Sequence, residues 1–173
     1  MTETGPIVGV LGLQGDVLEH RRAVADCGLR STVVRRPAEL AQVDALILPG
    51  GESTTMYRLL VAFDLMEPLR ARLASGMPAY GSCAGMILMS REVLDGVPDQ
   101  RQLAVLDVVV RRNAFGRQVA SFEADLDVAG LPSGPIRAFS RAAVWTRSPA
   151  SPWPEWLSHP ARSQAARAST SSP

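Results

Sequence analysis

The sequence predicts an α/β fold built on a parallel sheet with helices on both faces. Short β-rich apolar runs alternate with segments of helical periodicity from residue 7 to residue 94, and this alternation is typical of parallel sheets covered on both sides. Two of the runs end in glycine-rich turns, at residues 48–54 and 79–87. The chain has 173 residues, of which 46% are hydrophobic and 20% charged, which suits one domain with a sizeable core.

The first part of the chain predicts a strand, a helix and a strand. Residues 7–13, IVGVLGL, read as a buried strand that ends at a QGD turn. Apolar and alanine positions recur at helical spacing over 17–27, and Gly28 stands where a helix C-cap is expected. Residues 30–36, RSTVVRR, follow as a second strand.

The next part repeats this order. Residues 44–51, DALILPGG, are a strand stopped by Pro-Gly-Gly. Residues 56–76 have helical periodicity, which is interrupted near Pro68. Residues 77–83 then predict a strand that leads into a turn, and residues 84–94 predict a helix.

The last third of the chain changes character. Residues 103–112 and 120–128 predict two strands close together, as an antiparallel excursion. From residue 138 to residue 173, 25 of 36 residues are Ala, Arg, Ser or Pro, and Glu155 is the only acid. This composition is typical of low-complexity, disordered sequence. We therefore predict one domain over 1–137 and a disordered or frameshifted tail over 138–173.

Composition excludes several classes of partner. The net charge is +1, which gives no reason to expect nucleic acid or a membrane surface. No apolar run approaches the roughly 20 residues of a membrane helix, and the N-terminus lacks the pattern of a signal peptide. The two cysteines, Cys27 and Cys83, are typical of cytosolic thiols. We expect a cytoplasmic protein.

The stretch AYGSCAGMI at 79–87 predicts a nucleophile at Cys83. A strand, then Gly-Ser-Cys-Ala-Gly, then a helix is the pattern of a nucleophile elbow, in which a strained turn exposes the reactive side chain. The following helix would point its N-terminus at the sulfur and favour the thiolate. The alternative is a buried structural cysteine, which is the interpretation that we favour for Cys27 at a helix end.

The stretch LPGGEST at 48–54 predicts a second loop at the same sheet edge. Two glycines after a buried strand allow backbone N–H groups to point outward, and Ser53 is a plausible helix cap. The alternative is an ordinary strand-to-helix loop. Because carboxyl ends of parallel strands meet at one edge, this loop and Cys83 can converge on one site.

Four stretches together resemble a known family: GVLGLQGDVLEH, LPGGESTTM, AYGSCAGMILMS and RRNAFGRQVASFEADLDV. They resemble the glutaminase subunit of pyridoxal phosphate synthase, the PdxT family of class I glutamine amidotransferases. The resemblance covers residues 7–137 and departs at Gly12, where the family usually has alanine. It implies a flavodoxin-like parallel sheet that has lost its C-terminal strands.

The resemblance also implies roles for single residues. Cys83 resembles the nucleophile that attacks the side-chain amide of glutamine. Gly51 and Ala84 match the oxyanion-hole positions, whose backbone N–H groups bind the developing charge. Gly51, Glu52 and Ser53 match the segment that holds glutamine. Arg112 matches an arginine that contacts the substrate, and a guanidinium can pair a carboxylate.

The resemblance implies partners as well. The substrate would be L-glutamine, and the ammonia would pass to a separate (β/α)8-barrel synthase subunit that assembles pyridoxal phosphate from two sugar phosphates. No cofactor and no metal ion is implied for this chain.

The histidine and carboxylate of such a triad are not found. A cysteine of this class needs a histidine base that a carboxylate orients, and the family supplies both from a Ser-Phe-His-Pro-Glu segment. His20 reads as a surface or interface residue. His159 precedes a proline, but Ala161 stands where the carboxylate is expected, so we interpret this His-Pro pair as coincidence.

Two explanations of the tail stay open. The residues Trp-Thr-Arg-Ser at 145–148 can be encoded so that another reading frame gives Val-Asp-Glu-Val, a normal sequence for the family, which points to a frameshift near Ala138. The rival is a genuine divergent tail. The first gives a catalytically impaired glutaminase subunit, and the second fits a non-catalytic docking or regulatory module. An unrelated cysteine hydrolase is disfavoured by the NAFGRQVASF stretch.

Overall fold

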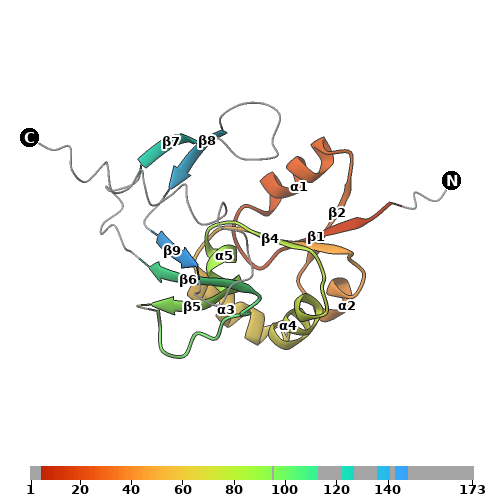
Figure 1. Cartoon of the computed structure of the whole chain (residues 1–173). Helices are drawn as coiled ribbons and strands as arrows, with labels where there is room; N and C mark the ends of the chain where they lie inside the picture. Colours follow the sequence, from red (N-terminus) through yellow and green to blue (C-terminus); the bar gives the residue numbers. More distant parts are fainter. Residues whose placement is uncertain (1–4, 95, 113–121, 127–135, 141–142, 148–173) are drawn as a thin grey trace, which may run out of the picture. The chain divides into compact units, whose positions relative to one another are not determined.

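The computed structural model describes residues 5–94, 96–112, 122–126, 136–140 and 143–147 (Figure 1). The chain divides into two compact units, residues 1–106 and residues 107–173, and each is described by itself. None of the described helices is long and apolar enough to cross a lipid bilayer.

A parallel four-stranded sheet forms the centre of the first unit. Its strands are β1 (Ile7–Leu11), β2 (Arg30–Val34), β3 (Ala45–Leu48) and β4 (Ala79–Gly81), in the order β2-β1-β3-β4. Val10 pairs with Val33 on one side and Ile47 on the other, and all three strand pairs are parallel. The carboxyl ends of the strands therefore share one edge, as predicted.

Helices cover both faces of this sheet (Figure 1). They are α1 (Val17–Asp26), α2 (Pro37–Leu40), α3 (Ser53–Ala62), α4 (Met66–Ala74) and α5 (Ala84–Met89). Buried side chains of α2 to α5 form one apolar cluster with Leu11, Leu46 and Leu48 of the strands. The buried Val24 of α1 is not part of that cluster, because α1 lies on the opposite face. The predicted α/β class is confirmed.

Three helices end in the same way. In α1 the residue after the cap is Gly28, with φ of 73°. Its N–H bonds to the Ala25 carbonyl at 2.9 Å, and Leu29 N–H bonds to the Val24 carbonyl at 3.1 Å. This is the Schellman pattern that the sequence predicted at Gly28. Asp64 and Gly76 take the same place after α3 and α4, also with positive φ.

The single helix predicted over 56–76 is two helices, and the break is not at Pro68. The chain turns at Asp64, where φ is 55° and Leu65 N–H bonds to the Leu60 carbonyl at 2.8 Å. Aspartate is one of the few residues that visit this left-handed region routinely. Pro68 instead lies in the first turn of α4, where no intrahelical N–H partner is needed.

The helix predicted over 84–94 is also wrong beyond Met89. Ser90 is fully buried and its hydroxyl donates to the Ile87 carbonyl at 2.6 Å. Strand β5 (Ser90–Leu94) then begins. The carbonyls of Leu88 and Met89 accept from the N–H groups of Leu103 and Val105 instead of from a further helical turn. The segment that ends the helix thus lies 15 and 16 residues further along the chain than the carbonyls that it satisfies.

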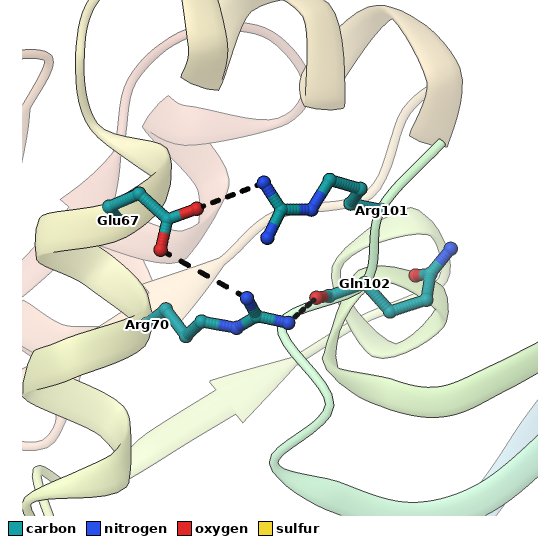
Figure 2. A network of polar contacts seen from close by, with 4 residues as sticks. All are labelled: Glu67, Arg70, Arg101 and Gln102. Carbon is teal, nitrogen blue, oxygen red and sulfur yellow. Dashed lines mark hydrogen bonds and ion pairs between the residues drawn. The ribbon is translucent and has the colours of Figure 1, made fainter. Parts of the chain in front are cut away.

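The loop after β5 is tied to α4 by polar contacts. Figure 2 shows Glu67, whose carboxylate lies 3.3 Å from Arg101 and 4.0 Å from Arg70. Arg70 also donates to the Gln102 carbonyl at 3.1 Å. The two ion pairs are exposed, so they contribute little to the stability of the fold. The same loop also brings Gln100 to the start of α3, where its side-chain oxygen accepts a hydrogen bond from Thr54 Oγ1 at 3.0 Å.

The second unit contains two antiparallel pairs. Strand β6 (Leu106–Arg112) pairs with β9 (Ala143–Arg147), and β7 (Phe122–Leu126) pairs with β8 (Ile136–Ser140). The strands predicted over 103–112 and 120–128 correspond to β6 and β7. The boundary predicted after residue 137 falls inside β8, and β9 lies beyond it, while residues 148–173 lie outside the described residues. The division into a domain and a disordered or frameshifted tail stays a prediction.

Candidate functional site

Cys83 occupies a strained turn between β4 and α5. Its φ is 48° and its ψ is −109°, a combination that costs a non-glycine residue about 1–3 kcal/mol and that clusters at functional sites. The turn is held by Ser82 N–H, which donates to the Leu48 carbonyl at 3.1 Å, and by Gly85 N–H, which donates to the Ser82 carbonyl at 2.8 Å. The thiol-bearing residue is exposed. The geometry predicted for a nucleophile elbow is therefore present.

The glycine after the elbow is required by close approach. A Cβ atom on Gly85 would lie 2.1 Å from the carbonyl oxygen of Leu48. Since this oxygen belongs to the main chain of β3, no side-chain rotation can relieve the contact. Gly85 therefore lets α5 begin directly against the sheet, and Ala84, its first residue, is 1% exposed.

The loop after β3 lies beside Cys83, as predicted. A Cβ atom on Gly50 would be 3.5 Å from Cys83 Cβ and 4.0 Å from Ser82 Oγ. Gly51 follows with φ of 139°, which L side chains rarely adopt. The two glycine-rich strand ends thus converge at one sheet edge.

Glu52, not Ser53, is the cap of α3. Its carboxylate accepts from Thr54 N–H at 3.1 Å, Thr55 N–H at 2.7 Å and Thr55 Oγ1 at 2.9 Å. Partial burial raises the pKa of Glu52, but the hydrogen bonds from Thr55 and Thr54 outweigh it and lower that pKa from 4.5 to about 2. The carboxylate therefore fixes the loop that carries Gly51 against α3.

Ser53 is buried instead. It is 2% exposed, and its hydroxyl has no hydrogen-bond partner within the described residues. A buried hydroxyl of this kind costs free energy unless a water or ligand satisfies it. Ser53 thus offers a polar group at the start of α3, directly after the Gly50–Gly51 turn.

Gln14, in the QGD turn after β1, is a site residue that the sequence did not predict. Its side-chain Nε2 donates to the Glu52 carbonyl at 2.7 Å, and a Cβ atom on Gly51 would lie 2.8 Å from the same nitrogen. The turn after β1 therefore clamps the loop after β3. The sequence position of Gln14 could have indicated this role. Gln14 directly follows the first predicted strand, whose carboxyl end lies at the same sheet edge as residues 49–51.

His20 also lies closer to the site than the sequence indicated. Its ring is partly buried, and Nε2 lies 3.2 Å from Ser82 Oγ. The same ring meets Tyr80 edge to face, with centroids 6.3 Å apart. His20 thus contacts the residue that precedes Cys83.

The structure says less about the other residues that the sequence singled out, Arg112, His159 and Cys27. Arg112 ends β6, where it pairs with Ala143, and its side chain is outside the description, as is all of His159. The interpretation of Cys27 as a buried structural cysteine is wrong, because it is exposed at the cap of α1. The described residues contain no group of three or more His, Cys, Asp or Glu that could hold a metal ion.

Comparison with known proteins gives consistent matches. Residues 10–151 match the SNO glutamine amidotransferase family. A protein of Frankia alni is 58% identical over 142 residues, which are 82% of this chain and 71% of that protein. One of Acidothermus cellulolyticus is 62% identical over 81% of this chain and 68% of its own length. Both are named pyridoxal 5'-phosphate synthase subunit PdxT.

A third relative and a solved structure match the chain as well. The equivalent protein of Nocardia farcinica, with the same name, is 61% identical over 81% of this chain, which spans 62% of that relative. Among solved structures, one titled as a crystal structure of glutamine amidotransferase has a TM-score of 0.72 and 40% identity, covering 84% of this chain and 75% of that one.

Proposed function

The chain belongs to the SNO glutamine amidotransferase family, within its PdxT branch, and from this premise we propose that it is the glutaminase subunit of a pyridoxal 5'-phosphate synthase. It would hydrolyse L-glutamine to glutamate and ammonia, and a separate barrel-shaped synthase subunit would consume the ammonia. The observation that carries the proposal is the strained, exposed Cys83 beside the Gly50–Ser53 loop.

The chemistry follows from this arrangement. The Cys83 thiolate adds to the side-chain carbonyl carbon of glutamine, and the oxygen that becomes negative is stabilised by the backbone N–H groups of Gly51 and Ala84. The C–N bond then breaks, and the nitrogen leaves as ammonia after it gains a proton. Water hydrolyses the resulting thioester, which releases glutamate and restores the thiol.

We assign substrate binding to the loop after β3, where the unsatisfied hydroxyl of Ser53 gives glutamine one buried polar partner. For Arg112 we keep the role that the family resemblance implies, which is to pair the substrate carboxylate. Glu52 acts indirectly in this proposal. Its carboxylate is held by the first turn of α3, so it sets the position of the Gly51 peptide.

The step for which we find no well-placed group among the described residues is proton transfer to the leaving nitrogen. The described residues include one histidine, His20, whose Nε2 is bonded to Ser82, and His159 lacks a carboxylate at residue 161. We therefore propose that hydrolysis is impaired. The alternative, favoured by the same observation, is a non-catalytic module that docks on the synthase subunit and regulates it.

The test is a glutamine-dependent ammonia assay of the whole chain with the synthase subunit from the same source. A full-length relative such as the Frankia alni protein serves as the positive control. We expect ammonia release that is at least about 10²-fold slower than in the control, since general acid–base assistance contributes about 10²–10⁴-fold, and loss of the residual rate in Cys83→Ala. A residual rate unchanged in Cys83→Ala would overturn the glutaminase assignment.

A further inference from the structure

We propose that His20 is a positioning residue for Cys83, on which it acts through the hydroxyl group of Ser82. The inference rests on the proposed role of Cys83 as the nucleophile. It assigns to the start of α1 a part in the site that neither the strand-turn-helix pattern nor the glycine-rich loop predicts.

The first observation is the contact itself. His20 Nε2 lies 3.2 Å from Ser82 Oγ, although the two residues are 62 positions apart. The edge-to-face contact with Tyr80 on β4 keeps the ring directed toward the end of that strand. Tyr80 is 59% exposed, so the hydrogen bond is the more specific of the two contacts that place the ring.

The second observation concerns Ser82. Its N–H donates to the Leu48 carbonyl, its carbonyl accepts from Gly85 N–H, and its hydroxyl meets His20. These three bonds anchor it to β3, to α5 and to α1. The next residue, Cys83, has the strained φ of 48°, and such a conformation persists only where the surroundings over-determine it.

Within the part of the chain that the structure describes, His20 thus supplies the one anchor of Ser82 that comes from a side chain. Its removal leaves the two backbone bonds, so the turn still forms, but Ser82 Oγ and the adjacent Cys83 gain freedom. We expect the reactive thiol to spend less time in the geometry that faces Gly50 and Gly51. The effect should be about two- to tenfold in the reaction rate of Cys83, the range that one hydrogen bond supplies.

The chemistry of the bond allows a rescue test. A serine hydroxyl can donate or accept, and so can an imidazole nitrogen, depending on its tautomer. Glutamine at position 20 keeps a polar terminus at similar reach but loses the ring. Phenylalanine keeps a ring against Tyr80 but has no polar atom. The two substitutions therefore separate the hydrogen bond from the packing.

The experiment measures the rate at which a chloromethyl ketone analogue of glutamine alkylates Cys83 in the whole folded chain. The thiolate displaces chloride, and mass spectrometry of the digested protein resolves Cys83 from Cys27. The variants are His20→Phe, His20→Gln, Ser82→Ala and the double variant His20→Phe/Ser82→Ala. The matched control is Arg21→Ala, which removes another side-chain bond from α1 to a serine, that of Arg21 Nε to Ser31 Oγ at 3.3 Å.

We expect Cys83 to be alkylated about two- to tenfold more slowly in His20→Phe and in Ser82→Ala. The double variant should be no slower than Ser82→Ala alone, because both changes remove the same bond. His20→Gln should recover most of the rate, Arg21→Ala should match the unchanged chain, and the Cys27 rate should stay constant throughout.

Three results would overturn the proposal: unchanged Cys83 rates in His20→Phe, additive losses in the double variant, or a slower Cys83 rate in His20→Gln than in His20→Phe. The last would mean that ring packing on Tyr80 is what matters. A failure of the proposed function is distinguishable, since Cys83 would then react no faster than Cys27 in the unchanged chain.

Discussion

The carboxylate of Glu52 accepts two backbone N–H groups and one hydroxyl at the start of α3. Its pKa in the folded chain is about 2, below the ordinary 4.5. A depressed folded pKa stabilises the fold at pH values above the unfolded pKa, and that contribution is lost as the pH falls toward the folded pKa. Glu52 is an exposed residue, so solvent screens part of the effect.

We predict that Glu52→Ala lowers the free energy of unfolding at neutral pH by about 0.5–2 kcal/mol, the usual effect of losing a helix cap. The difference from the unchanged chain should shrink as the pH is lowered from about 4.5 to about 2. Urea unfolding over this pH range measures it. Glu19→Ala is the control, because among the described residues the ion pair of Glu19 is an exposed one, with Arg22 at 4.0 Å; an equal loss there would contradict the account.

Gln14 is the second residue whose role the structure adds. It bonds the Glu52 carbonyl at 2.7 Å, next to the Gly51 peptide that we assign to the oxyanion hole. We predict that Gln14→Leu slows alkylation of Cys83 by the glutamine chloromethyl ketone about two- to tenfold, while the Cys27 rate stays the same. Unchanged Cys83 alkylation would mean that the loop holds its shape without this clamp.

At the scale of elements, α5 and β3 show how closely a helix can approach a sheet. The backbone of Gly85 lies directly against the carbonyl of Leu48, and the same carbonyl accepts from Ser82 N–H. The Leu48 carbonyl therefore sets both the packing of α5 on β3 and the geometry of the turn at Cys83. Any side chain at position 85 must push α5 away from β3 and disturb Cys83.

We predict that Gly85→Ala destabilises the chain by about 1–3 kcal/mol, as overpacking of a close contact does, and lowers its Tm. Gly5→Ala is the matched control, since a Cβ atom at Gly5 meets nothing within 4 Å. Thermal unfolding of both variants followed by circular dichroism provides the comparison. Equal Tm values for the two would refute the close-approach argument.

The elements also show what a sequence can and cannot predict. Strands β1 to β4 and the cap at Gly28 were predictable because apolar runs and glycines are local signals. The end of α5 at Met89 was not, because its last carbonyls are satisfied by Leu103 and Val105, which lie far along the chain. Asp64 ended α3 where proline was the more obvious local signal.

At the scale of the whole molecule, three turns meet at the carboxyl edge of the four-stranded sheet. They follow β1, β3 and β4 and carry Gln14, Gly51 and Cys83. Sequence patterns identified Cys83 and Gly51, since each sits in its own glycine-rich turn. Gln14 and His20 were missed because only the folded chain brings their side chains to these turns.

The tail allows a prediction about activity. If His159 has no catalytic role, His159→Ala should leave the rate of ammonia release from glutamine unchanged in the presence of the synthase subunit. The comparison is with Cys83→Ala, which should abolish the release. A chain as active as a full-length relative, with activity lost in His159→Ala, would make the tail a catalytic element and refute the frameshift explanation.

The central claim is that Cys83 is a glutamine-directed nucleophile. The most direct measurement is the rate at which the glutamine chloromethyl ketone labels Cys83 and Cys27 in the same folded chain, with and without L-glutamine. Both cysteines are exposed, so exposure alone predicts similar rates. We predict much faster labelling of Cys83, protection of Cys83 by glutamine and no protection of Cys27. Equal labelling of the two thiols, unaffected by glutamine, would contradict the account.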